Sequence, residues 1–399
     1  MASASPNLTL NDFHFCSMDS TEEIPQYIPG GYHPIAIGDI LGTNDSCRYR
    51  IMHKLGYGSY STVWLAQKTD SSNSFVAVKI TMAEVGQSLE AAMLEAASRQ
   101  VQSNSEQRPG SLALLDHFTL EGPNGSHSVL MTDIVVPIFT LQTRCPGPWR
   151  RATTHGLVQA IADLHAAGIV ESPPTNPRSN LHVGNLGFAF PQLSDQDPEV
   201  VMQELSPYEL TIVLPTTAVH QTASLPSYVV MPCNITAYYL KLASSDPPLT
   251  KVLDFGAAHN VGTPSPSFQC AWIALAPAVA FAIKVEKVEN PTIDPAADIW
   301  ALGTAIFEIV TGSPIFYLTS LPYAMLKVAD VLPPGWENWY ANLSDPPGVS
   351  CRERVRRTCT DDADADMLSA LLRKILALDP ALRCSAVEIV DDPWFKYST

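Results

Sequence analysis

Apolar and polar residues alternate with a short period in the first third of the chain, as they do in β-strands. Tyr49 and Ile51 precede the glycine-containing turn Gly56-Tyr57-Gly58, and the apolar run Val63-Trp64-Leu65 follows it. Two apolar stretches that flank glycines are typical of two strands joined by a flexible turn. Three more stretches predict strands by the same criterion: Phe75–Val78, Ser111–Phe118 and Ser128–Val136.

The period becomes helical further along the chain. Thr81–Val101 is rich in Ala, Glu, Leu and Met, which favours a helix. Beyond Pro146-Gly147-Pro148, apolar residues recur at helical spacing in two stripes and a third segment: Leu157, Ile161 and Leu164; Ile299, Leu302, Ile306 and Ile309; and Met367–Leu378. Asp294-Pro295 begins the second of these helices and Gly312 ends it, because an acidic cap, an early proline and a closing glycine are helix boundary signals.

This order of elements predicts an α+β protein. Residues 1–48 are polar and turn-rich and are predicted to form an N-terminal extension. A single domain is expected over 49–397, with a small sheet lobe at 49–136 that holds one helix and a larger, mainly helical lobe at 137–397. Residues 186–250 are rich in Pro and Ser and predict an insertion, because irregular segments of that length are uncommon in compact domains.

Composition narrows the class of protein. The chain has 399 residues, 46% of them hydrophobic, which excludes a mainly disordered protein. Lys and Arg number 24 against 40 Asp and Glu, a net charge of −16, which argues against general binding to nucleic acid or anionic lipid. The most apolar run, Ala271–Ile283, contains Pro277 and is shorter than the roughly 20 residues of a membrane helix. The eight cysteines are scattered, so we expect a soluble protein of a reducing compartment, the cytoplasm, with the nucleus left open as a further location.

The glycine turn and a later lysine are candidates for phosphate binding. Glycines at positions 56 and 58 let a backbone approach a polyphosphate closely, although a glycine hairpin by itself is usually an ordinary turn. Lys79 follows about 20 residues later at the end of Val76-Ala77-Val78, where a strand lysine could reach the same phosphates. Glu95 on the predicted helix is expected to hold the Lys79 ammonium in an ion pair, with Glu90 as the competing candidate.

Two oxygen-bearing side chains are candidates for metal binding. Asp254 follows an apolar, strand-like stretch and precedes Phe255-Gly256, and its carboxylate could bind the Mg²⁺ that bridges nucleotide phosphates. Asn185 would supply a second ligand. Asp298, near the start of an apolar helix, is predicted instead to be a buried structural acid that accepts hydrogen bonds from backbone N–H groups.

Taken together, these motifs resemble the eukaryotic protein kinases, and within them the SR-protein kinases, including the fungal members of that family. The similarity covers about residues 22–397, and it extends to an entry segment and to the end of the chain. Segments that carry it are Tyr27–Pro34, Ile37–Asp39, Lys54–Ala66, Asp379–Ala386 and Pro393–Phe395.

The resemblance implies a two-lobed fold, a site for ATP and Mg²⁺, and Ser or Thr of a protein as the phosphoryl acceptor. The metal would be held by Asn185 and Asp254. Adenine would lie near Asp133 and Val135, and the other expected nucleotide contacts are Leu55, Gly56, Gly58, Ser61, Val63 and Lys79. In that family the preferred substrates are Arg/Ser-rich segments, which would suit the negative charge of this chain.

The sequence departs from the family pattern at the catalytic loop. The family has a His-x-Asp motif after the equivalent of Val170, whereas here ten residues, 171–180, replace about three. Counting back five positions from Asn185 places Asn180 where the family has its catalytic Asp. An amide cannot accept the proton of a hydroxyl group, and loss of a general base typically costs about 100- to 10,000-fold in rate. Either the chain is a pseudokinase that binds ATP or acts as a scaffold, or 171–180 reflect a mis-joined exon of an active serine/threonine kinase.

A second departure lies near residue 277. The family has Ala-Pro-Glu where this chain has Ala276-Pro277-Ala278, and the missing glutamate would pair with an arginine that corresponds to Arg383. Arg383 is therefore expected to lack its carboxylate partner. If the guanidinium is buried, that loss costs roughly 3–5 kcal/mol.

Overall fold

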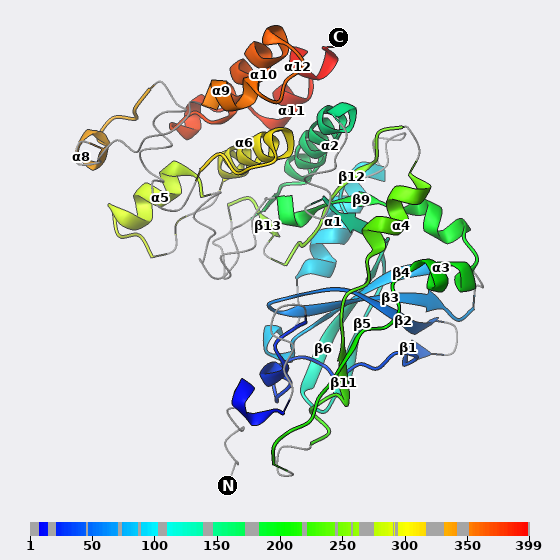
Figure 1. The fold of residues 1–399 in the computed structure, drawn as a ribbon. Helices are drawn as coiled ribbons and strands as arrows, with labels where there is room; N and C mark the ends of the chain where they lie inside the picture. Colours follow the sequence, from blue (N-terminus) through cyan, green and yellow to red (C-terminus); the bar gives the residue numbers. More distant parts are fainter. Residues whose placement is uncertain are drawn as a thin grey trace. The chain divides into compact units, whose positions relative to one another are not determined.

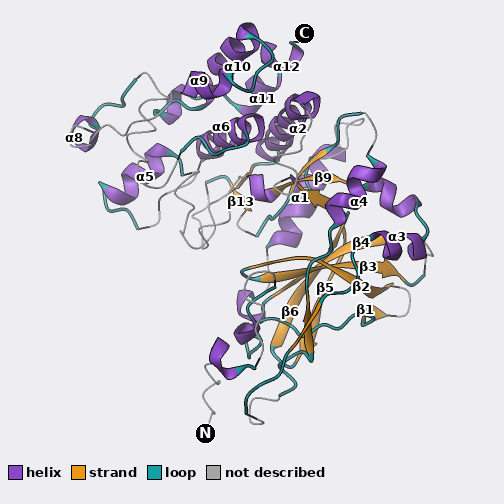
Figure 2. Ribbon diagram, viewed as in Figure 1, coloured by secondary structure: helices purple, strands orange, loops and turns teal. Residues whose placement is uncertain are grey.

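The computed structural model describes most of the chain as two compact units (Figure 1). It describes residues 8–14, 21–44, 47–70, 74–86, 89–102, 110–138, 147–171, 183–217, 222–243, 246–256, 258–262, 275–289, 291, 294–316, 331–340 and 351–397. The first unit comprises residues 1–91, 113–136 and 189–243, and the second comprises 92–112, 137–188 and 244–399. Strands dominate the first unit and helices the second, as Figure 2 shows, which confirms the predicted α+β class.

A six-stranded antiparallel sheet forms the first unit, in the order β1-β2-β3-β4-β6-β5. Its strands are β1 (Ile40–Asn44), β2 (Cys47–Gly58), β3 (Ser61–Lys68), β4 (Phe75–Thr81), β5 (Leu114–Gly122) and β6 (Gly125–Thr132). Alternation along the strands places Tyr49, Ile51, Trp64, Val78 and Met131 in one buried cluster, because successive side chains point to opposite faces of a sheet. This cluster is the core of the unit.

The extension and the insertion both pack on this sheet. The segment 189–243, predicted to be irregular, contains α3 (Pro198–Glu204), β10 (Leu210–Ile212), β11 (Tyr228–Val230) and α4 (Ile235–Leu242). Strands β10 and β11 form an antiparallel pair. A second apolar cluster joins extension to insertion and consists of Phe13, Ile24, Tyr27, Tyr32, Met82, Val213 and Val229. These two parts of the chain therefore complete the core of the first unit.

The second unit is mainly helical. Its longest helices are α2 (Gly147–Ala166), α6 (Pro295–Thr311) and α10 (Asp362–Ile375), and α6 packs against the other two. The other described helices are α5 (Pro277–Lys284), α8 (Glu337–Tyr340), α9 (Cys351–Arg356), α11 (Ala386–Val390), α12 (Pro393–Lys396) and all but the first two residues of α1 (Glu90–Gln102). Short strands are β8 (Ile169–Glu171), β9 (Leu186–Ala189), β12 (Thr250–Val252) and β13 (Ala258–Asn260). Helix α6 begins with an Asp294 cap and ends at Gly312 with φ 72°, as its sequence predicts. Within the described ranges, no helix has both the length and the apolar character that crossing a bilayer requires.

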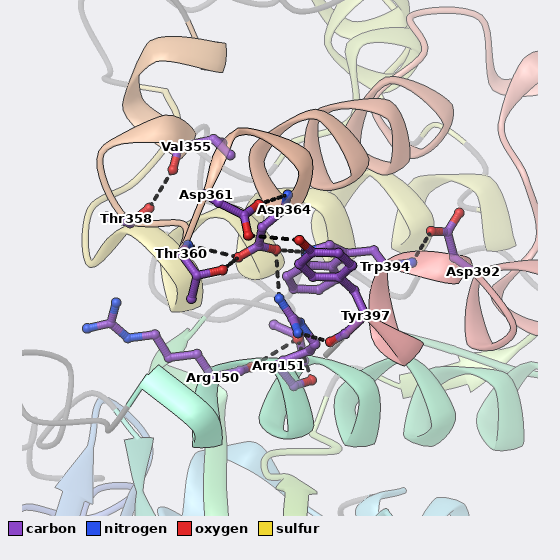
Figure 3. A network of polar contacts seen from close by, with 11 residues as sticks. Arg150, Arg151, Val355, Thr358, Thr360, Asp361, Asp364, Asp392, Trp394 and Tyr397 are labelled. Atoms are coloured by element: carbon purple, nitrogen blue, oxygen red, sulfur yellow. Dashed lines mark hydrogen bonds and ion pairs between the residues drawn. The ribbon is translucent and has the colours of Figure 1, made fainter. Parts of the chain in front are cut away.

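A polar network ties the C-terminal helices of this unit together (Figure 3). The Asp364 carboxylate is 3% exposed and accepts hydrogen bonds from Arg151 Nη2 at 2.7 Å and from Trp394 Nε1 at 2.8 Å. Thr360 donates to the same carboxylate, and the Tyr397 hydroxyl donates to Asp361 at 2.8 Å. The network therefore joins α2, α10 and α12 around one buried acid.

Some element boundaries differ from the predicted ones. The helix expected over Thr81–Val101 is shorter, and α1 spans Glu90–Gln102. Thr81 instead ends β4, where it pairs with Ser61, and Gly86 with φ 67° precedes the helix. The strand expected over 128–136 is divided into β6 and β7 (Val135–Pro137). Backbone pairing to neighbouring strands overrides the helical propensity of single residues at these positions.

Candidate active site

The glycine turn and Lys79 are brought together by strand register. Gly56 on β2 lies opposite Val63 on β3, and Val63 lies opposite Lys79 on β4. Directly opposed residues of an antiparallel sheet project to the same face. Gly56, Val63 and Lys79 therefore share one face, while the neighbouring residues Lys54 and Trp64 face the buried core.

The turn leaves room for a ligand beside its backbone. A Cβ built on Gly56 would meet no described atom within 4 Å, and one on Gly58 would meet only Ser61 Oγ, at 3.7 Å. Leu55, Ser61 and Val63 are partly exposed around the glycines. Backbone N–H groups next to open space are what a close approach to phosphate requires. The residues present thus fit the phosphate end of a nucleotide.

Lys79 forms its ion pair with Glu90 rather than with the expected Glu95. The Nζ atom of Lys79 lies 2.8 Å from Glu90 Oε1 and 2.9 Å from Glu90 Oε2. The Glu90 side chain is 2% exposed, whereas that of Glu95 is 50% exposed and pairs with Arg99 at 3.6 Å. Five residues turn an α-helix by about 140° beyond a full turn, so Glu90 and Glu95 face different directions. The competing candidate, Glu90, is therefore the partner of Lys79.

Asp133 and Val135 lie near Val136, where the second of the three segments of the first unit ends. The Asp133 carboxylate accepts a hydrogen bond from the Ala113 N–H at 2.8 Å, and Asp133 N–H donates to Ala113 O at 3.2 Å. Both residues are partly exposed, while Ile134 between them is buried. Their contact with adenine remains a prediction.

Asn185 and Asp254 are neighbours in the second unit. Strands β9 and β12 are antiparallel, with Val252 opposite Leu186, so Asn185 and Leu253 meet at the same end of the pair. Leu253 N–H donates to Asn185 O at 2.8 Å. Asp254 has φ 46°, in the left-handed region that Asp tolerates better than most residues, and Oδ1 lies 3.4 Å from Gly256 N.

The chemistry of these two side chains fits Mg²⁺. A carboxylate and an amide offer the hard oxygen donors that this ion prefers. Among the residues that the structure describes, no group of three or more His, Cys, Asp or Glu side chains could hold a metal. Mg²⁺ is usually bound through one or two carboxylates together with phosphate oxygens and water, so these two side chains could hold it.

Two further residues singled out in the sequence are Asn180 and Asp298. Asn180 lies outside the described residues. Asp298 is 2% exposed and accepts a hydrogen bond from His165 Nε2 at 3.0 Å, so it is a buried and hydrogen-bonded acid, as predicted.

Groups other than the missing glutamate bind the Arg383 guanidinium. Its guanidinium donates to three backbone carbonyls, those of Ala296 at 2.7 Å, Ala377 at 2.8 Å and Leu378 at 3.0 Å. It also lies over the Trp300 ring, 5.3 Å from the centroid. Burial lowers the pKa of Arg383 to about 10 although nearby Asp residues raise it, so the group stays charged at neutral pH. Carbonyl oxygens thus replace the carboxylate that Ala278 cannot provide.

Parts of this chain are similar to known protein kinases. Residues 241–395 match the protein kinase domain model. The chain is 37% identical over 132 residues to serine/threonine-protein kinase SKY1 of Saccharomyces cerevisiae, and 36% identical over 123 residues to serine/threonine-protein kinase spk-1 of Caenorhabditis elegans. It is 33% identical over 124 residues to SRSF protein kinase 3 of Homo sapiens.

Each of these matches covers only part of both proteins. They span 30% of this chain, and 16%, 12% and 21% of the yeast, nematode and human relatives. Asp254 lies inside the kinase domain match, while the glycine turn and Lys79 precede it.

Proposed function

We propose that this chain binds Mg-ATP and belongs to the enzymes that phosphorylate protein Ser or Thr, because residues 241–395 match the protein kinase domain model and part of the chain is similar to SR-protein kinases. The observation that carries the proposal is the Lys79–Glu90 ion pair beside the glycine turn. In protein kinases, a lysine on a strand of the small sheet is paired with a glutamate on a helix, and this pair orients the nucleotide phosphates.

Each group has a separate role in the proposed site. The N–H groups around Gly56 and Gly58 would cradle phosphates, and the Lys79 ammonium, oriented by Glu90, would neutralise their charge. When bound, Mg²⁺ would supply positive charge that offsets the negative charge of the phosphates. Asn185 and Asp254 would hold it. The partly exposed stretch at Asp133 and Val135 would meet adenine.

The partner of this site would be a protein, and we extend the proposal to Arg/Ser-rich segments. The net charge of −16 favours a basic partner over an acidic one. We place the activity in the cytoplasm, because the described cysteines Cys233, Cys359 and Cys384 are free thiols.

The catalytic step is proposed to be impaired in the chain as given. Asn180 stands where a carboxylate would accept the hydroxyl proton. Phosphoryl transfer depends mainly on positioning and charge stabilisation, so a slow residual rate is compatible with the other groups. A pseudokinase that binds ATP or partners is the second candidate, and the replaced catalytic loop at 171–180 favours it.

Sequencing of the transcript across residues 165–190 separates these two candidates. A message that encodes a His-x-Asp motif would exclude the pseudokinase, and one that encodes 171–180 as given would exclude the mis-joined exon.

Nucleotide binding tests the proposal directly. Mg-ATP should raise the melting temperature of the purified chain, and Lys79→Ala should abolish that rise because the phosphates lose their ammonium partner. Lys68→Ala is the matched control, since Lys68 ends the adjacent strand and lies outside the proposed site. A chain that Mg-ATP does not stabilise, or a Lys79→Ala variant that it stabilises as before, would contradict the proposal.

A further inference from the structure

A buried N-terminal segment lies behind the glycine turn. We call residues 21–32 the strap. It contains a short 3₁₀ helix, Ile24–Gln26, and buries Ile24, Tyr27 and Tyr32, each no more than 4% exposed. The sequence predicted that residues 1–48 form an N-terminal extension. The burial of the strap indicates a defined structural role.

The strap is anchored independently of the glycine turn. Gly30 N–H donates to Asn124 O at 2.7 Å, and Glu84 N–H donates to Gly30 O at 2.7 Å. The Asn124 side chain also donates to Tyr32 O at 2.6 Å. A Cβ on Gly31 would lie 1.7 Å from Gln26 O, so only glycine fits this tight turn. These contacts therefore hold the backbone from which the Tyr32 side chain projects.

Two side chains of the strap reach the strand that carries the glycines. The Tyr32 hydroxyl donates a hydrogen bond to Gly58 O at 2.8 Å. Glu22 forms an ion pair with Lys54, whose side chain is 0% exposed, and Tyr27 donates to the same carboxylate. Lys54 also lies over the Trp64 ring, 5.3 Å from the centroid. Lys54 and Trp64 are buried on the face of the sheet opposite to that of Lys79.

Fixing a glycine carbonyl matters for the binding of phosphate. Glycine has more backbone freedom than any other residue, and ordering it costs free energy. A loop that is already held in its bound conformation avoids that cost when the ligand binds. Because peptide groups are planar, holding the Gly58 carbonyl also fixes the direction of the Ser59 N–H.

We propose that Tyr32 is a positioning residue that holds the glycine turn ready for the phosphates of a nucleotide. The inference rests on the proposed nucleotide site and adds a residue of the extension to it. Tyr32 does not touch the ligand and acts through the Gly58 carbonyl. Burial raises the pKa of the Tyr32 hydroxyl well above its usual range, so the donor keeps its proton at any physiological pH.

The test compares Tyr32→Phe with Tyr49→Phe in the full chain. Both changes remove one hydroxyl from a buried tyrosine, and Tyr49 donates to Asp116 at 3.0 Å, away from the turn. Affinities for Mg-ADP and for adenosine are measured by calorimetry. Tyr32→Phe should weaken Mg-ADP by about 3- to 10-fold, the range for one hydrogen bond, and leave adenosine unchanged. Tyr49→Phe should bind both ligands as the unaltered chain does.

Hydrogen exchange of the ligand-free protein supplies the second readout. Amides of residues 56–61 should exchange faster in Tyr32→Phe than in Tyr49→Phe, because the turn has lost its tether. Unchanged exchange, or a Tyr32→Phe variant that binds Mg-ADP normally, would overturn the inference. An equal loss of ADP and adenosine affinity would also overturn it, since that pattern is a general structural effect. If the unaltered chain binds no nucleotide while exchange still rises in Tyr32→Phe, the tether exists and the proposed function fails.

Discussion

Lys79 and Glu90 form a close two-oxygen ion pair in which the carboxylate is almost fully buried and the ammonium is partly exposed. Both Glu90 oxygens lie within 2.9 Å of Lys79 Nζ, and the side chains are 2% and 21% exposed. Glu90 is the first residue of α1, where a carboxylate is also favoured by the helix dipole. The lysine is thus held by a rigid element and keeps an open side for a ligand.

Replacing Glu90 should therefore damage nucleotide binding more than replacing Glu95. In Glu90→Gln the ammonium loses its orienting charge, and we expect the stabilisation by Mg-ATP to fall markedly. Glu95→Gln should leave it unchanged, since the Glu95 side chain is 50% exposed and pairs only weakly with Arg99. Thermal shifts with and without Mg-ATP measure both effects. A larger loss in Glu95→Gln would show that the ion pair of the ligand-bound protein differs from this one.

The sequence indicated the strand part of the site better than its helix contacts. Glycines between two strands, followed by a strand lysine, predict that Lys79 could reach the phosphates bound at the glycine turn, and strand pairing places Gly56, Val63 and Lys79 on one face. The partner of Lys79 depended instead on which of two glutamates of α1 faces the strand, and helical propensity does not distinguish Glu90 from Glu95.

Long-range contacts of the extension were not predictable in this way. Asn185 and Asp254 were assigned to one site from the order of the motifs along the chain and from the family resemblance, and antiparallel pairing of β9 with β12 brings their backbones together. No periodicity links Tyr32 to Gly58 or Glu22 to Lys54, since these pairs come from unrelated segments. The burial of Lys54 in its strand can be recognised only when its neighbours in the folded structure are known.

Restoring a carboxylate at position 180 should increase phosphoryl transfer. Asn180→Asp would return a proton acceptor to the position counted from Asn185, and such a group contributes about 100- to 10,000-fold. The unaltered chain should phosphorylate an Arg/Ser-rich peptide slowly. Rates with labelled ATP provide the measurement.

Asn180→Ala is the matched variant for this experiment. It should match the slow rate of the unaltered chain, since neither amide nor methyl group accepts the proton. A fast rate in the unaltered chain, or equal rates in Asn180→Asp and Asn180→Ala, would exclude a role for position 180 in proton transfer.

The buried Asp364 should make the second unit sensitive to acid. Burial by itself would raise the pKa of this carboxyl, but hydrogen bonds from Thr360 and Trp394 and the charge of Arg151 lower it below the ordinary 3.8. The carboxylate therefore stabilises the fold above its ordinary pKa, and this contribution is lost as the pH falls through the lower, folded-state pKa. Urea unfolding between about pH 6 and pH 2 should show the loss.

Asp364→Asn should reduce stability at neutral pH and flatten its dependence on acid. Arg151 would lose its anionic partner, at a cost of about 2–3 kcal/mol, below that of a fully buried pair because the Arg151 side chain is 24% exposed. Asp366→Asn on the same helix is the control, since that side chain is 57% exposed. An unchanged acid profile in Asp364→Asn would assign the sensitivity to other groups.

Arg383 provides a test of how the chain tolerates Ala278. Three carbonyls and the Trp300 ring already hold the guanidinium, so Ala278→Glu should change the free energy of unfolding by less than about 1 kcal/mol. Arg383→Ala should cost at least about 3 kcal/mol, because it leaves those carbonyls without donors. Arg383→Lys should fall between the two, since an ammonium on a flexible stem cannot match a planar guanidinium at three acceptors and a ring. Urea midpoints of the three variants measure the order. A marked gain from Ala278→Glu together with little loss in Arg383→Ala would mean that the carbonyls do not substitute for the missing carboxylate.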